Sequence, residues 1–185
     1  MNKFIYIFIF FFSLVNTKVI ANENIMILNL KYGKVELELY PDKAPLHVKR
    51  FKELADKGKY DNVVFHRVID GFMAQTGDVK FGNTSSSDFN LSLAGTGGSD
   101  LPNIKAEFTN IAHDRGTLSA ARSTDPDSAN SQFFICLQSA PHLDRQYSAF
   151  GKVISGMEFV DKIKKGDPSS GSVPDPDKII SLRSK

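Results

Sequence analysis

Residues 65–78 read FHRVIDGFMAQTGD, and the polar residues of this stretch surround a short apolar run. His66 and Arg67 precede the run, while Gln75 and Asp78 follow it. One interpretation is an ordinary β-hairpin whose polar side chains face water. The other is one wall of an active site, in which Arg67 and Gln75 are set into an apolar surface for a chemical purpose.

Short apolar runs recur on both sides of this stretch. In residues 33–39, Val35, Leu37 and Leu39 alternate with glutamates, which predicts a strand with one wet face. Residues 25–30 are its expected partner, and the KYGK sequence at the junction fits a tight hairpin turn. Further strands are expected in residues 63–68, 72–75, 116–121, 132–137, 147–154 and around 178–182. Several short strands and few helices indicate a mainly β fold, either a barrel or a sandwich.

Two segments show helical spacing instead. Between Pro45 and Gly58, apolar residues recur every three or four positions at Val48, Phe51, Leu54 and Ala55. Proline fits a first helical turn, and glycine fits the position just past the end. A second helix is expected in residues 156–166, with Met157, Val160 and Ile163 on its apolar side. Residues 77–102 form the longest irregular stretch, and loops of this length are often functional or mobile.

The N-terminal segment has the three-part layout of a secretory signal. Lys3 supplies a positive start, residues 4–15 form an apolar run of 12, and residues 19–21 are small enough at their ends for cleavage after Ala21. An uncleaved membrane tether is the alternative, but spanning a bilayer takes roughly 17–25 apolar residues. We therefore expect residues 1–21 to be a signal peptide and residues 22–185 to be one exported domain, periplasmic or secreted. Membrane contact is expected only if the segment stays uncleaved.

Charge and cysteine content argue against several classes of function. The chain carries 23 basic and 21 acidic residues, and loss of residues 1–21 removes two lysines and no acid, which leaves 21 of each. A neutral chain without a long basic run does not indicate a nucleic-acid partner. Cys136 is the only cysteine, and within QFFICL it is expected to be a buried, unreactive thiol. No set of cysteines, histidines and carboxylates shows zinc-ligand spacing, so no metal or other cofactor is expected.

Two further segments join the opening stretch in a specific order. They are GTLSAARSTDPDSANSQFFI at residues 116–135 and PHLDRQYSAFGKV at residues 141–153. With these blocks, and with SQFFI in particular, the sequence closely resembles the cyclophilin family of peptidyl-prolyl cis/trans isomerases, from near Ile25 to near Leu182. The resemblance implies a closed eight-stranded antiparallel β-barrel capped by two α-helices. That fold agrees with the mainly β interpretation reached from the apolar pattern.

The chemistry of X–Pro isomerisation explains why such a site would need an arginine. The uncatalysed barrier is roughly 18–20 kcal/mol because the amide loses resonance as it twists. The proline nitrogen then becomes pyramidal and regains a lone pair, so a hydrogen-bond donor aimed at it favours the twisted state over both planar ground states. The resemblance gives this role to Arg67, which stays protonated and offers a rigid fork of N–H groups. Gln75 is expected to assist it as the second catalytic residue.

The resemblance also implies the residues that bind the substrate. An apolar pocket for the proline ring would be lined by Phe72, Met73, Phe134 and Leu143. The peptide on either side would be held by Gln132 and by the backbone around Ala121, Arg122 and Ser123, while Gly95 would flank a neighbouring pocket through close backbone approach. Taken singly, the apolar residues fit a core and Arg67 fits a strand residue in a salt bridge. Their joint occurrence favours the site.

Three places depart from the best-known cyclophilin pattern. His142 stands where many eukaryotic members carry tryptophan, and Tyr147 stands where they carry histidine. Arg122 and Ser123 replace a common Asn-Ala. Leu143 is retained, and an imidazole or a phenol still covers the rim, so the pocket should persist. Strong cyclosporin binding is not expected, because the missing tryptophan is its usual partner.

These residues imply a peptidyl-prolyl isomerase that assists the folding of exported proteins, because X–Pro isomerisation limits folding in many chains. Its partners would be proline-containing unfolded or flexible polypeptides, and a monomer is expected. The alternative is a binding module, a chaperone or scaffold that docks proline-containing segments in the same groove. A Ser/His/Asp hydrolase is disfavoured, since no G-x-S-x-G elbow exists and the sequence gives no way to bring a serine, a histidine and an acid together. His66 is expected to be structural, because isomerisation requires no general base.

Overall fold

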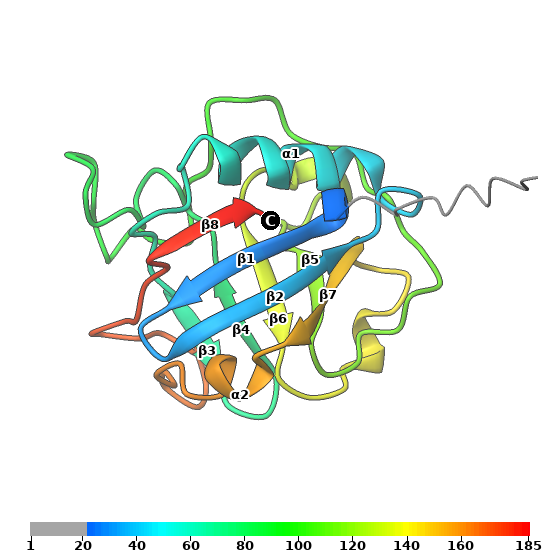
Figure 1. The fold of residues 1–185 in the computed structure, drawn as a ribbon. Coiled ribbons are helices and arrows are strands. Elements are labelled where there is room, and N and C mark those ends of the chain that lie inside the picture. The colour runs from blue at the N-terminus through cyan, green and yellow to red at the C-terminus, as the bar shows by residue number, and fades with distance from the viewer. Residues whose placement is uncertain (1–21) are drawn as a thin grey trace, which may run out of the picture.

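Eight antiparallel strands form one sheet in the computed structural model, which describes residues 22–185. The strands are β1 (Ile25–Leu30), β2 (Gly33–Leu39), β3 (Arg67–Ile69), β4 (Met73–Thr76), β5 (Thr117–Ala120), β6 (Phe133–Cys136), β7 (Ala149–Ser155) and β8 (Ser181–Ser184). The order across the sheet is β3-β4-β6-β5-β7-β2-β1-β8, and the sheet curls around its core (Figure 1). The mainly β fold with eight antiparallel strands is confirmed. The predicted signal peptide, residues 1–21, lies outside the described residues.

Closure of the curled sheet differs from the expected barrel. The edge strands β3 and β8 are not paired with each other; instead, the segments that precede them are joined by an isolated bridge between Val64 and Lys178. The amide of Ile179 also donates to the carbonyl of Val63 at 2.9 Å. Because these residues pair with the segment before β3, the last strand begins at Ser181 rather than near residue 178.

In the hairpin of β1 and β2, the alternating apolar residues of the sequence all face the core. The inward residues are all buried: Met26, Leu28, Leu30, Val35, Leu37 and Leu39. Glu38, between two of them, is exposed, and Leu30 pairs directly with Gly33 across the tight turn. Full burial of one such aliphatic side chain stabilises the fold by about 1.5–3 kcal/mol. The predicted strands and their turn are confirmed.

Helix α1 (Pro45–Asp56) packs the predicted apolar stripe against the sheet and lies along β8 (Figure 1). Its N-cap residue, Ala44, has no side chain able to accept a hydrogen bond. A distant carboxylate takes its place. Glu107 accepts from the backbone amides of Leu46 and His47 at 3.0 Å each, and its Oε2 lies 2.7 Å from the His47 Nδ1. A negative charge at this end also suits the helix dipole.

Loss of the Glu107 carboxylate should destabilise the fold. We expect Glu107→Ala to lower the free energy of unfolding by about 0.5–2 kcal/mol, the usual cost of removing a helix cap. Urea denaturation followed by circular dichroism measures it. Glu158→Ala is the matched control, because Glu158 is an exposed glutamate in the first turn of α2 (Met157–Val160). Equal midpoints for both variants would contradict the assignment of Glu107 as the cap.

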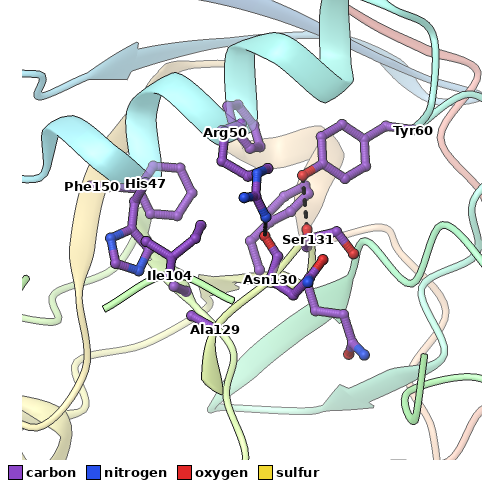
Figure 2. Close-up of a pocket in the computed structure, with 12 residues that line it drawn as sticks. His47, Arg50, Tyr60, Ile104, Ala129, Asn130, Ser131 and Phe150 are labelled. Atoms are coloured by element: carbon purple, nitrogen blue, oxygen red, sulfur yellow. Dashed lines mark hydrogen bonds between the residues drawn. The ribbon is translucent and has the colours of Figure 1, made fainter. Parts of the chain in front are cut away.

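Figure 2 shows the side chains that line the interface beneath α1. The void left there measures about 10 Å³, roughly the minimum that a single water molecule needs. Arg50 reaches across it to the carbonyl of Asn130, and the Tyr60 hydroxyl donates to the carbonyl of Ser131 at 2.8 Å. This interface is therefore core rather than a ligand site. Its hydrogen bonds fix the chain just before Gln132.

The second helix is shorter than the sequence predicted. Residues 156–166 were expected to be helical, but α2 ends at Val160. The following amides have other partners: Lys164 N–H donates to the Asp177 carboxylate and Gly166 N–H donates to the Val68 carbonyl, at 2.9 Å each. Both amides would be needed for further helical turns. Short 3-10 helices also occur at Asn22–Asn24, Pro126–Ser128 and Pro141–Leu143. Neither α-helix of residues 22–185 has the length and apolar character that crossing a membrane requires.

Candidate active site

An open pocket of about 350 Å³ lies on the outer face of the sheet, on the side of β3, β4 and β6 away from the core. Its lining residues are Arg67, Phe72, Met73, Gln75, Ala121, Arg122, Phe134, His142, Leu143 and Tyr147. A second pocket of about 250 Å³ adjoins it and includes Gly95, Ser123 and Gln132. The two pockets share Gln75, Ala121 and Arg122. All the residues singled out from the sequence thus come together at two adjoining pockets.

Strand register explains why residues far apart in sequence share this face. Arg67 of β3 pairs with Gln75 of β4, Gln75 pairs with Phe134 of β6, and Phe134 pairs with Ser119 of β5. Directly paired residues project from the same face of a sheet. They therefore form one row across four strands. Met73, two residues before Gln75, projects from that face as well.

The walls of the first pocket are apolar and aromatic. Met73, Phe134 and Leu143 form a small buried cluster, against which Phe72 and Tyr147 pack. The ring of Phe134 meets the ring of Tyr147 edge-on, with 5.9 Å between centroids. At the rim, the rings of Phe72 and His142 are 5.4 Å apart. A surface of this kind suits the ring of a proline, which is apolar and lacks a backbone N–H.

Cys136 belongs to the same apolar cluster but offers no chemistry. The side chain is fully buried beneath the pocket. Burial raises the pKa of its thiol to about 12, so the sulfur stays protonated at neutral pH. The predicted burial of the cysteine is confirmed. No group of three or more His, Cys, Asp or Glu side chains in residues 22–185 is arranged to hold a metal ion.

The polar side of the site is a hydrogen-bonded row. Arg67 donates from Nε to the carbonyl of Ser170 at 3.0 Å and from Nη1 to Gln75 Oε1 at 3.5 Å. Gln75 Nε2 then donates to Gln132 Oε1 at 3.0 Å. The guanidinium is thus oriented from two sides. Within residues 22–185 its Nη2 donates no hydrogen bond, which leaves it available to a ligand.

Arg122, where the sequence departs from the familiar pattern, joins the two walls of the pocket. Its Nη2 donates to the carbonyl of Gln146 at 2.9 Å, and its guanidinium lies 4.4 Å from the centre of the Tyr147 ring. A cation over an aromatic face is stabilised by about 0.5–2 kcal/mol, depending on exposure. The substituted pair Arg122 and Tyr147 therefore fit each other.

A serine, a histidine and an aspartate do come together, contrary to the expectation from the sequence. His113 Nδ1 lies 3.0 Å from Asp144 Oδ1, and His113 Nε2 lies 2.9 Å from Ser119 Oγ. Ser119 is 0% exposed, so no substrate can reach its hydroxyl. Burial lowers the pKa of His113, which favours the neutral ring, and that ring stacks on Phe134 at 6.2 Å. The arrangement supports the pocket floor and does not indicate hydrolysis.

His66, which stands beside Arg67 in the sequence, belongs to the interior. Burial lowers the pKa of its ring to about 4, so the ring is neutral at physiological pH. A Cβ added at Gly95 would lie 2.9 Å from the ring, and Gly95 itself has a φ of +102°. This position therefore requires glycine, both for space and for its backbone conformation.

Sequence reasoning missed two residues that organise the site, Asp78 and Asp144. Asp78 is fully buried and receives backbone amides from the loop that carries Gly95. Asp144 receives the backbone amide of His113 at 2.8 Å and follows the turn that carries Leu143. In the sequence, Asp78 closes the stretch FHRVIDGFMAQTGD and stands at the start of the longest irregular stretch, but neither place indicates its buried partners. Nothing local marks the partner of Asp144.

Comparison with known proteins agrees with this geometry. The model of the cyclophilin type peptidyl-prolyl cis-trans isomerase family matches residues 25–184. A probable peptidyl-prolyl cis-trans isomerase of Brucella suis is 56% identical over 159 residues, which cover 85% of this chain and 81% of that protein. The peptidyl-prolyl cis-trans isomerase of Acinetobacter baylyi is 38% identical over 184 residues, which cover 94% and 88%.

Solved structures give the same result. Cyclophilin AquaCyp293 from Hirschia baltica shares the fold, with a TM-score of 0.73 at 24% identity over 88% of this chain and 74% of that one. A cyclophilin type peptidyl-prolyl cis-trans isomerase of Cryptosporidium parvum, solved in the presence of the dipeptide Ala-Pro, gives a TM-score of 0.72 at 28% identity over 87% and 98%. The chain belongs to the cyclophilin-type peptidyl-prolyl cis-trans isomerases.

Proposed function

We propose that Arg67 is the catalytic hydrogen-bond donor of this isomerase and that the apolar pocket holds the substrate proline. The observation that carries the proposal is the position of the guanidinium at the edge of a pocket lined by Phe72, Met73, Phe134 and Leu143. A proline ring seated there would bring its nitrogen close to a charged donor. The donor stabilises the pyramidal nitrogen of the twisted amide more than the planar nitrogen, so it lowers the barrier.

Gln75 and the adjoining pocket would fix the rest of the peptide. Rotation about one bond requires one side of the amide to stay anchored while the other turns. We propose that the part of the substrate peptide that precedes the proline lies along Gly95, Ala121 and Gln132, where backbone and amide groups can hydrogen-bond to it. No covalent bond breaks in this reaction, so the site needs neither a nucleophile nor a general base.

A peptide assay tests the activity directly. Uncatalysed X–Pro isomerisation takes tens to hundreds of seconds at 25 °C. We expect residues 22–185 to accelerate it in a proline tetrapeptide followed by exchange NMR. Unchanged exchange rates at a saturating enzyme concentration would overturn the proposal.

We further propose that the protein acts on exported proteins, in the periplasm or after secretion. Support comes from the signal-like layout of residues 1–21, and from a reaction that consumes no nucleotide. Its clients would be proline-containing unfolded or flexible chains. N-terminal sequencing of the exported protein should begin at Asn22. A sequence that begins at Met1, in the membrane fraction, would contradict cleavage and indicate a tether.

A further inference from the structure

Asp78 is the centre of the long loop that borders the site. The side chain is 0% exposed, and each carboxylate oxygen accepts two backbone N–H groups. Oδ1 accepts from Lys80 and Phe81 at 3.1 and 2.9 Å, while Oδ2 accepts from Gly95 and Gly97 at 2.8 Å each. One buried charge therefore ties the start of the loop to its end. A buried carboxylate needs such partners, because an unpaired one is costly.

The end of the loop is hydrogen-bonded to the polar row of the site, which consists of Gln132, Gln75 and Arg67. Gln132 Nε2 donates to the carbonyls of Gly95 and Gly97 at 3.0 and 2.8 Å. Its Oε1 accepts from Gln75 Nε2, and Gln75 Oε1 faces Arg67 Nη1. A continuous path of hydrogen bonds thus runs from the buried carboxylate to the guanidinium.

The direction of this path is fixed by chemistry. A backbone carbonyl can only accept, so Gln132 must turn its NH₂ group toward Gly95 and Gly97 and its oxygen toward Gln75. Gln75 must then turn its own NH₂ group toward Gln132, which leaves its oxygen for Arg67. Without the two carbonyls, either amide could flip and present an NH₂ group to the guanidinium, which cannot accept a hydrogen bond.

We propose that Asp78 is a positioning residue for Arg67: by holding Gly95 and Gly97 in place, it sets the amide orientation of Gln132 and Gln75 and so aims the guanidinium at the apolar pocket. The inference rests on the proposed role of Arg67 and assigns its support to a residue that does not line either pocket. The fit at the junction is tight. A Cβ added at Gly97 would lie 2.6 Å from Asp78 Oδ1.

The test compares Asp78→Ala with Asp177→Ala in the purified protein. Asp177 is the matched control: it is another buried carboxylate that receives a backbone amide, from Lys164 at 2.9 Å, and it has no bond to the polar row. We measure kcat and KM for a proline tetrapeptide, corrected for the folded fraction. We also record the NMR signals of the Arg67 Nε–H group and of the Gln75 and Gln132 side-chain amides.

Asp78→Ala should lower kcat on the order of 10-fold at nearly unchanged KM, because small misplacements of a catalytic group lower the rate steeply. The Arg67, Gln75 and Gln132 signals should shift in this variant. Asp177→Ala should leave kcat and these signals close to wild type, even if it is less stable. A folded Asp78→Ala protein with wild-type kcat and unmoved Arg67 and glutamine signals would overturn the proposal.

If Asp78→Ala does not fold, Gly97→Ala tests the same positioning role of Asp78. The added methyl group must push Gly97 away from the carboxylate, so kcat should fall and the glutamine amide signals should shift in the same way. Wild-type kcat and signals in Gly97→Ala would likewise overturn the inference. An active Arg67→Ala protein would instead refute the proposed catalytic role. An inactive Arg67→Ala beside a fully active Asp78→Ala would refute only the positioning.

Discussion

Replacement of Arg67 by alanine should lower kcat for a proline tetrapeptide by about 100-fold or more, the usual cost of removing a preorganised donor from a developing charge. The guanidinium is placed by two hydrogen bonds, to the Ser170 carbonyl and to Gln75, and it borders the apolar pocket. In the proposed mechanism, the contact of the guanidinium with the proline nitrogen would strengthen only as the amide twists. The loss should therefore appear in kcat rather than in KM.

Two further variants make this result specific. Arg67→Lys keeps the charge but loses the rigid fork, so it should recover only part of the activity. Arg115→Ala is the control, because Arg115 pairs with Asp161 away from both pockets and should leave kcat unchanged. Full turnover by a folded Arg67→Ala protein would refute the mechanism. If Arg67→Ala is inactive yet complements a deletion strain, binding of proline-containing segments rather than catalysis is the required function.

The sequence alone predicted the strands well where one face is wet. Val35, Leu37 and Leu39 alternate with glutamates, so their period identifies both the strand and its buried side. In QFFICL every residue after the first is apolar, so no alternation with polar residues indicates which side chains face the core. Phe133 turns out to face the core and Phe134 the pocket. Only the resemblance to cyclophilins singled out Phe134, since the period of an all-apolar strand carries no direction.

Contacts between distant segments account for what the sequence did not predict. Helix α2 stops early because Asp177 takes the Lys164 amide, and α1 begins without a polar N-cap because Glu107 supplies one. The pairing of Val64 with Lys178 replaces a ladder between the edge strands. Each contact joins residues at least 13 positions apart in the sequence. The conformational preferences of a local segment do not indicate such partners, so only the folded structure identifies them.

Replacement of Phe134 by alanine should raise KM for the tetrapeptide by about 10–150-fold, which corresponds to the loss of about 1.5–3 kcal/mol of apolar contact. Phe134 is 5% exposed, pairs with Gln75 across the sheet and meets Tyr147 edge-on. If the pocket holds the substrate proline as proposed, contact of Phe134 with the proline ring would be nearly the same in the planar and twisted states. Because such uniform binding lowers KM without raising kcat, kcat should change much less than in Arg67→Ala.

A variant of the neighbouring residue, Phe133, distinguishes an effect on substrate binding from an effect on stability. Truncation of a buried phenylalanine commonly costs about 3–5 kcal/mol of stability, so Phe134→Leu should be measured beside Phe134→Ala, with the folded fraction of each variant determined. Phe133→Leu is the matched control: it lies on the same strand but packs against Phe51 and Tyr60, with ring centroids 5.0 and 5.5 Å away. It should lose stability and keep a wild-type KM. Similar KM values for Phe133→Leu and Phe134→Leu would mean that the pocket floor does not bind the proline, since the two side chains differ mainly in the face of the sheet from which they project.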